Sequence, residues 1–152
     1  MTQLRIGNLT VGNDRPLTVI AGPCQLESDD HAQMVAGILK EACDAAGAQF
    51  IFKASYDKAN RTSLSGKRGL GIEKGLQVLQ SVARANDVPV LTDVHNEAQC
   101  AQAGEVVDVL HARVDGVFRR PGHLEAAPAA QQQQDEAWGI FAGRDVEGTV
   151  RP

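Results

Sequence analysis

The sequence predicts an α/β fold built on a parallel sheet. Short apolar runs alternate with segments of helical periodicity, in the order β-α-β-α-β-α-β up to residue 110. This order is typical of parallel strands joined by right-handed crossovers. The chain has 152 residues, of which 43% are hydrophobic. That is enough for one domain with a core, whereas a complete (β/α)8 barrel takes about 250 residues.

The elements can be placed in order along the chain. Residues 4–20 begin with two short strands, which are marked by Leu4, Ile6, Leu9 and Val11, and the segment 12–14 supplies turn residues. Further strands are predicted at 17–22, 49–55, 88–94 and 105–110. The first helix begins at the N-cap Ser28 and ends at Gly47, and the second carries its apolar face over 72–83. A short third helix, capped by Asn96 or a neighbouring residue, runs to about Gly104.

The segment 111–152 has a different character. It contains a run of glutamines at 131–134, several Ala-Pro and glycine-rich steps and few aliphatic residues. This composition predicts a loosely ordered tail, with a short helix near 124–138 and no further strand–helix unit. We therefore divide the chain into a domain at 1–110 and a tail at 111–152.

Charge and cysteine content exclude several classes of protein. The net charge of −4, from 15 basic and 19 acidic residues, gives no basic surface for general nucleic-acid binding. The three cysteines are far apart, which predicts no disulfide framework, and Cys43 lies on an apolar helical stripe where we expect it to be buried. The sequence has no signal-peptide pattern and no apolar run of about 18 residues. We expect a reduced, cytoplasmic protein without a nucleic-acid or membrane partner.

Polar side chains gather where the predicted strands end. Cys24 follows the strand at 17–22, and Asp93 and His95 end the strand at 88–94. The strand at 49–55 is followed by the richest group, which comprises Lys53, Ser55, Asp57, Lys58, Asn60 and Arg61. Because the carboxyl ends of parallel strands meet at one edge, where α/β proteins bind ligands, we expect these side chains to share a site.

The basic group has two interpretations. Lys53, Lys58 and Arg61 place three cations within nine residues, which suits a bound phosphate or carboxylate. The alternative is a solvated basic loop in which Asp57 pairs locally. A P-loop at 65–68 is rejected because the earlier glycine and the Ser or Thr after the lysine are missing. A dinucleotide motif at 69–75 is rejected because its last glycine is one position too late and no strand directly precedes it.

The other candidates also remain open. Cys24 is a nucleophile, a metal ligand or a structural thiol. Asp93 and His95, spaced i and i+2, form an acid–base or ligand pair, or His95 is a hydrogen-bonded loop residue. We assign no role to the other histidines, which are His31, His111 and His123.

Four segments resemble the 3-deoxy-D-manno-octulosonate 8-phosphate (KDO-8-phosphate) synthases of the DAHP/KDO-8-phosphate synthase family. They are IAGPCQLES at 20–28, FKASYDKANRTS at 52–63, GLGIEKGLQVL at 69–79 and LTDVH at 91–95. The resemblance covers residues 4–110. DAHP synthases typically have Lys-Pro-Arg-Thr where this chain has Lys58-Ala-Asn60-Arg61, so the KDO branch and arabinose 5-phosphate are favoured.

The resemblance implies a TIM (β/α)8 barrel, usually a homotetramer, of which this chain holds the N-terminal part with a preceding β-hairpin. It implies condensation of phosphoenolpyruvate with D-arabinose 5-phosphate, release of phosphate, and a place in lipopolysaccharide biosynthesis. By resemblance, Lys53 and Lys58 contact phosphoenolpyruvate, and Asp93 and His95 lie near the reacting carbons. The sugar phosphate is held by Asn60 and Arg61 with Ser55 and Asp57 in support, and Cys24 binds a divalent metal ion.

The family pattern stops after Leu110. The family's Ile-Pro-Ala-Phe-Leu and Arg-Gln-Thr-Asp segments are replaced by HARVDGVFRRPGHLEAAPAA, and the remaining metal ligands are not matched. We therefore expect an incomplete barrel. Two functions stay open for this chain: the synthase, and a non-catalytic remnant that keeps part of a phosphate-binding rim.

Overall fold

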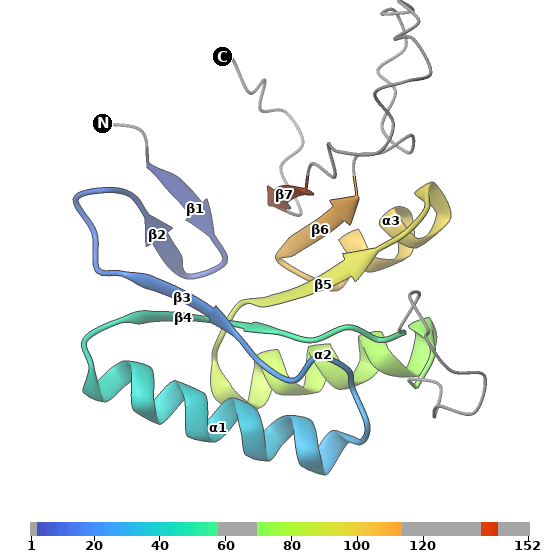
Figure 1. Cartoon of the computed structure of the whole chain (residues 1–152), viewed down its shortest axis with the longest axis horizontal. Coiled ribbons are helices and arrows are strands. Elements are labelled where there is room, and N and C mark those ends of the chain that lie inside the picture. Colours follow the sequence, from blue (N-terminus) through green and yellow to red (C-terminus); the bar gives the residue numbers. More distant parts are fainter. Residues whose placement is uncertain (1–2, 58–69, 114–137, 143–152) are drawn as a thin grey trace, which may run out of the picture.

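The centre of the protein is a five-stranded sheet (Figure 1). A computed structural model describes residues 3–57, 70–113 and 138–142. The strands lie in the order β3 (Thr18–Ala21), β4 (Gln49–Lys53), β5 (Val90–Val94), β6 (Val109–Arg113) and β7 (Trp138–Ala142). The first four strands are parallel, and β7 pairs antiparallel with β6. The predicted α/β fold with a parallel sheet is confirmed.

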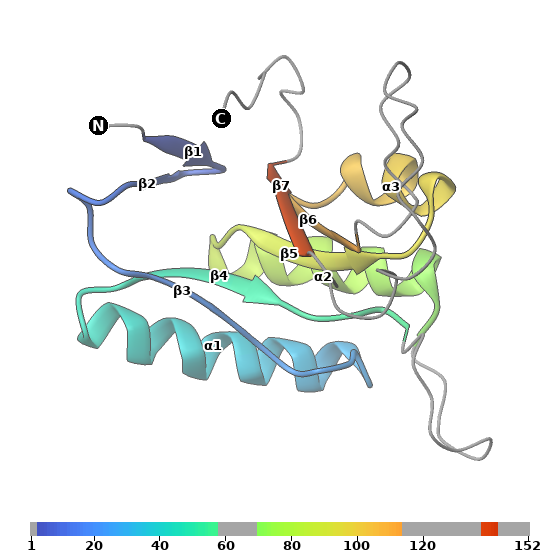
Figure 2. The ribbon, with the colours of Figure 1, turned by 45° about the horizontal axis from the view of Figure 1, so that its top comes forward.

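Three helices connect the parallel strands, namely α1 (Asp29–Ala45), α2 (Ile72–Asn86) and α3 (Glu97–Gly104). They pack on the sheet, α1 against β4, α2 against β5 and α3 against β5 and β6 (Figure 2). The predicted caps are confirmed, because Ser28 Oγ accepts a hydrogen bond from the His31 amide at 3.1 Å and the Asn96 side chain accepts one from the Gln99 amide at 2.9 Å. Gly47 follows α1 with a φ of 67°, as expected for a helix stop.

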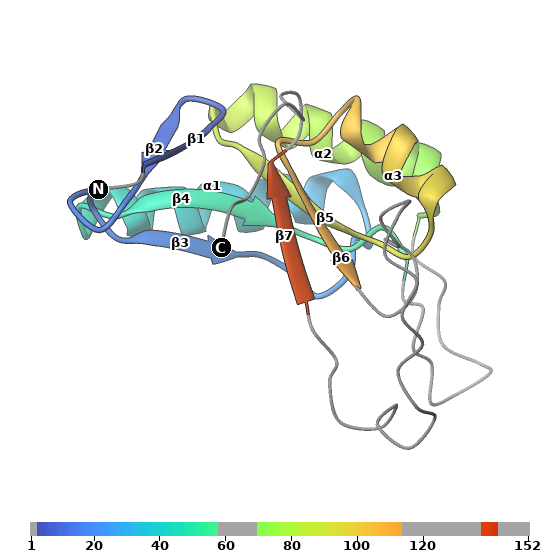
Figure 3. The same cartoon turned by 90° about the horizontal axis from the view of Figure 1, so that it is seen from above.

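The sheet has an apolar core on each face. The larger core, between the sheet and the helices, contains Phe52, Leu79 and the predicted buried Cys43. On the other face Ile51, Leu91 and Val109 form a second core with Ile6. Ile6 belongs to a hairpin of β1 (Leu4–Ile6) and β2 (Leu9–Val11), which covers that face at the amino end of the strands (Figure 3). One end of this face is thereby closed, and its carboxyl end is left for polar side chains.

Three details of the sequence prediction are corrected. The hairpin turn is Gly7-Asn8, where Gly7 adopts a φ of 54° that suits glycine. The segment 12–14 forms the next turn, in which the Arg15 amide donates to the Gly12 carbonyl at 3.0 Å.

The strand predicted at 105–110 begins only at Val109 and continues to Arg113. Val106 and Val107 lie in the segment that leaves α3, where both of their amides donate to the Ala103 carbonyl at 2.9 Å. Their apolar side chains pack in the larger core. The strand also continues past residue 110, where the prediction ended it, and β7 pairs with it from within the segment 111–152. The predicted helix near 124–138 lies outside the described residues except at Trp138, which is in a strand.

None of the helices in the described parts of the chain has the length and apolarity needed to span a membrane.

Candidate active site

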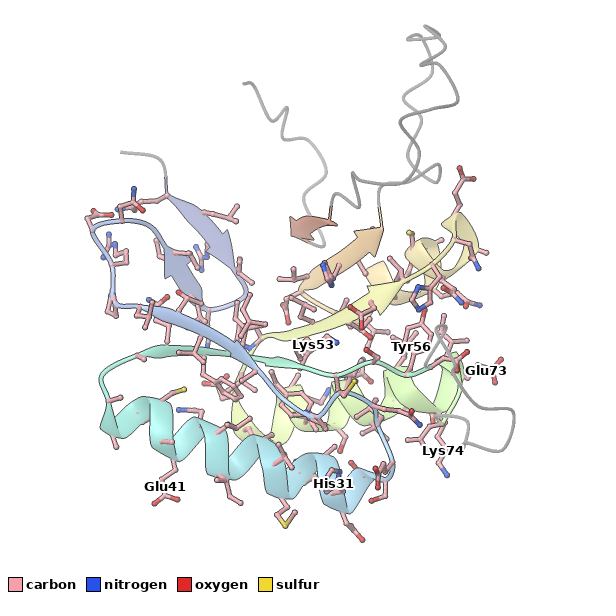
Figure 4. The ribbon with its side chains drawn as sticks, viewed as in Figure 1. His31, Glu41, Lys53, Tyr56, Glu73 and Lys74 are labelled. Carbon is pink, nitrogen blue, oxygen red and sulfur yellow. The ribbon has the colours of Figure 1, made fainter. Side chains whose placement is uncertain are left out.

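The face of the sheet that carries the hairpin changes from apolar to polar along the strands. Side chains two residues apart on a strand share a face, so Lys53 follows Ile51, Asp93 follows Leu91 and His111 follows Val109. The first of each pair belongs to the core beneath the hairpin. The second lies nearer the carboxyl end of its strand, as the sequence predicted for Lys53 and Asp93. Figure 4 shows Lys53 between the ribbons of β4 and β5.

Asp93 is the centre of a hydrogen-bonded cluster that joins three strands. Lys53 Nζ lies 2.8 Å from Asp93 Oδ2 and donates to Ser55 Oγ at 3.0 Å. Ser55 Oγ donates in turn to Asp93 Oδ2. His111 Nδ1 lies 2.8 Å from Asp93 Oδ1. We call Lys53, Ser55, Asp93 and His111 the Asp93 cluster.

The environment of Asp93 favours its ionised form. Burial is the largest single effect and raises the pKa of the carboxyl group. The hydrogen bonds from Lys53, Ser55 and His111, together with the positive charge of Lys53, outweigh burial and leave the pKa of Asp93 below its ordinary value. Because an ionised carboxylate only accepts hydrogen bonds, His111 must carry a proton on Nδ1.

The loop after β3 is anchored to the segment that carries Lys53 and Ser55. The Leu26 amide donates to the Ser55 carbonyl at 2.9 Å. A Cβ atom on Gly22 would lie 2.0 Å from the Lys53 carbonyl oxygen, so only glycine permits this approach. These two contacts hold the loop after β3 against the end of β4, as the sequence predicts. Cys24 lies between them in the sequence.

Tyr56 belongs to the larger core on the helical side of the sheet. It is 1% exposed and lies near the start of α2, where Figure 4 labels it beside Glu73 and Lys74. A Cβ atom on Gly75 would lie 2.3 Å from Tyr56 Cβ, so α2 closely approaches the segment that follows β4. Burial, followed by the nearby Cys100, Asp57 and Asp93, raises the pKa of the Tyr56 phenol. Its hydroxyl group has no hydrogen-bond partner among the described residues.

The structure joins Asp93 to His111, whereas the sequence pattern paired Asp93 with His95. The His95 backbone amide donates to Gln99 Oε1 at 2.8 Å. The predicted strand at 105–110 ends one residue before His111, so the sequence pattern assigns no role to this residue. Continued alternation past Val109 was the pattern that would have found it.

The remaining predicted residues fall into two sets. Asp57 lies at the end of the described segment 3–57, and Lys58, Asn60 and Arg61 lie outside the described residues. Cys24 is exposed. Within the parts of the chain that the structure describes, no group of three or more His, Cys, Asp or Glu side chains could hold a metal ion. The described residues therefore offer Cys24 alone and do not complete a metal site.

The chain is similar to known proteins over most of its length. The model of the DAHP synthetase I family matches residues 1–114. A 2-dehydro-3-deoxyphosphooctonate aldolase of Rickettsia bellii is 51% identical over 126 residues, which are 83% of this chain and 46% of that protein. Proteins of the same name from Bartonella quintana and Brucella ovis are 50% and 51% identical over 109 and 107 residues, which are 72% and 70% of this chain.

In the Bartonella and Brucella proteins the match covers 39% of the relative, so the chain spans less than half the length of these curated relatives. The family model nevertheless includes β3 to β6 and every described member of the Asp93 cluster. This chain belongs to the DAHP synthetase I family.

Proposed function

We propose that this chain carries the N-terminal part of the active site of a KDO-8-phosphate synthase, which condenses phosphoenolpyruvate with D-arabinose 5-phosphate and releases phosphate. The observation that carries the proposal is the Asp93 cluster, which fixes the Lys53 ammonium group at the carboxyl edge of the sheet. The relatives named 2-dehydro-3-deoxyphosphooctonate aldolase support the choice of reaction. A role in lipopolysaccharide biosynthesis follows from the product.

The chemistry requires two anionic substrates to lie close together. The C3 carbon of phosphoenolpyruvate attacks the aldehyde carbon of the sugar phosphate, water adds at C2, and the phosphate group leaves. The clustered lysines and Arg61 offset the repulsion between the substrates, and Lys53 orients phosphoenolpyruvate. Ser55 and Asp93 hold the ammonium group in place, and His95 and Asp93 are proposed to lie near the reacting carbons.

The sugar phosphate is proposed to bind to Asn60 and Arg61, with Lys58 at phosphoenolpyruvate and Asp57 supporting the pocket. An arginine binds phosphate through two parallel hydrogen bonds, which suits the terminal phosphate of a sugar. We also propose the wider architecture of the family for the complete protein: a TIM barrel whose first strands are β3 to β6, a homotetramer, and a cytoplasmic location.

Cys24 is proposed as one ligand of a divalent metal ion. A bound metal ion would polarise the aldehyde or orient the attacking water. A thiolate–metal bond can be tested without turnover, because a Co²⁺–thiolate complex absorbs in the near ultraviolet. We expect this absorption in the wild type and its loss in Cys24→Ser, while Cys43→Ser, at a buried cysteine on α1, should keep it. An equal absorption in both variants would refute the assignment.

The function is tested by phosphate release from phosphoenolpyruvate with arabinose 5-phosphate, in the presence of added divalent metal and of chelator. We expect release from the wild type and a loss of at least about 100-fold in Lys53→Met, the scale for removing one fixed electrostatic group. Lys40→Met on the exposed side of α1 is the matched control. Soluble, folded wild-type protein that releases no phosphate would refute the proposal and leave the non-catalytic remnant.

A further inference from the structure

His111 occupies a position that only the strand register creates. Its Cα is the partner of the Asp93 Cα in the parallel pairing of β5 and β6. Adjacent strands in a sheet lie about 4.8 Å apart, and side chains at paired positions share a face. The imidazole and the carboxyl group are therefore held at hydrogen-bonding distance by the backbone ladder, and His111 Nδ1 lies 2.8 Å from Asp93 Oδ1.

The two oxygens of Asp93 are used from opposite sides. Oδ1 is hydrogen-bonded to His111 on β6. Oδ2 is paired with Lys53 at the end of β4 and accepts a hydrogen bond from Ser55, two residues further on. The Asp93 side chain is only 13% exposed, so water does not readily replace a lost partner. Without His111, the Asp93 carboxyl group would lose the hydrogen bond that holds Oδ1. The carboxyl group could then rotate, and Oδ2 would no longer be held toward the Lys53 ammonium group.

We propose that His111 is a positioning residue for Lys53, acting through Asp93. Its Nδ1–H holds Oδ1, so that Oδ2 and Ser55 together hold the ammonium group where the anionic substrate binds. The expected consequence, tighter binding of phosphoenolpyruvate, rests on the proposed function. The hydrogen-bonded chain itself does not depend on the reaction.

The first test needs no variant. Nitrogen-15 NMR of the wild-type protein at neutral pH should show the His111 imidazole with its proton on Nδ1. A proton found on Nε2 alone would overturn the inference, because Nδ1 could then not donate to an ionised Asp93.

The second test compares two substitutions at the same position. His111→Phe keeps the ring but removes the donor, whereas the side-chain nitrogen of His111→Asn can donate from nearly the place of Nδ1. Carbon-13 NMR of the Asp93 carboxyl group should give a raised pKa in His111→Phe and a value close to that of the wild type in His111→Asn. His31→Phe, in the first turn of α1, is the control and should leave the Asp93 titration unchanged.

The third measurement is the affinity for phosphoenolpyruvate by calorimetry. One hydrogen bond to a charged group corresponds to about a tenfold weaker affinity in His111→Phe, which His111→Asn should largely restore. An unchanged titration and affinity in folded His111→Phe would refute the positioning role, as would a folded His111→Asn that restores neither. If the wild type does not bind phosphoenolpyruvate, the proposed function fails, and the Asp93 titration alone decides the role of His111.

Discussion

Replacing Asp93 by asparagine should cost more stability than any other single change within the Asp93 cluster. The substitution keeps the shape of the side chain but removes its charge. Asparagine can still accept from His111 through its carbonyl oxygen, but its NH2 group then faces the Lys53 ammonium group and the Ser55 hydroxyl group. The contact with Lys53 then becomes one in which the ammonium and amide groups both carry hydrogens toward each other, and the Ser55 hydroxyl group can no longer donate to this atom.

The size of the effect follows from the burial of the pair. The side chains of Lys53 and Asp93 are 27% and 13% exposed, so the pair lies between a buried and a surface ion pair. Removing one partner of a buried pair costs about 3–5 kcal/mol, and hydrogen bonds to charged groups contribute about 1.5–3 kcal/mol each. We expect Asp93→Asn to lose about 2–4 kcal/mol in the free energy of unfolding.

The dependence on pH gives an independent readout. The pKa of Asp93 is lowered in the folded protein, so ionised Asp93 stabilises the fold above the unfolded pKa of about 3.9. This contribution is lost as the pH falls through the lower, folded pKa. The stability difference between wild type and Asp93→Asn should therefore be largest above about pH 5 and should shrink at lower pH.

The assay is urea denaturation followed by circular dichroism, from pH 3 to 7. The control is Asp44→Asn, which removes the exposed Lys40–Asp44 pair on α1, where the charged atoms lie 2.5 Å apart and the side chains are 35% and 59% exposed. A surface pair of this kind is expected to contribute less than about 0.5 kcal/mol. Equal losses in the two variants, or a difference for Asp93→Asn that does not change with pH, would refute the reasoning.

Two further predictions concern packing and solubility. Gly75→Ala should destabilise the protein by about 1–3 kcal/mol, because the new Cβ would lie 2.3 Å from Tyr56 Cβ. Gly37→Ala on α1, where the nearest atom is 3.9 Å away, should stabilise it by about 0.5–1 kcal/mol; urea midpoints in the reverse order would contradict this. Met34 and Ile38 on α1 are 56% and 61% exposed, so replacing both with Glu should reduce aggregation in light scattering, and unchanged aggregation would show that this face is not its origin.

The helices and the first three strands of the sheet could be predicted because their information is local. A continuous apolar run such as that around Phe50 is typical of a strand buried on both faces, and Ser28 and Asn96 mark helix starts through their own side chains. The start of β6 was misplaced because Val106 and Val107 are also apolar, the first partly buried and the second buried, but they lie in the segment between α3 and β6. Burial and strand conformation cannot be separated over so few residues.

The site was predicted in its residue types but not in its contacts. Lys53, Ser55 and Asp93 were expected at one edge because parallel strands end together. Their hydrogen bonds depend on the register between strands, which no pattern within a single strand contains. His111 was missed for the same reason: its role exists only because β6 places it opposite Asp93. The antiparallel pairing of β7 with β6 is likewise a property of two distant segments.

The charge of the Asp93 cluster implies that different residues of the proposed site attract and orient the anionic substrates. Lys53 is paired with Asp93, so this pair has no net charge and is suited to orienting an anion more than to attracting it. We expect the attraction to come largely from other cations, such as the proposed ligand Arg61. Lys53→Met should therefore lower kcat more than it raises KM, whereas Arg61→Ala should mainly raise KM for arabinose 5-phosphate. Steady-state kinetics showing the opposite pattern would mean that Lys53 leaves Asp93 to bind the substrate directly.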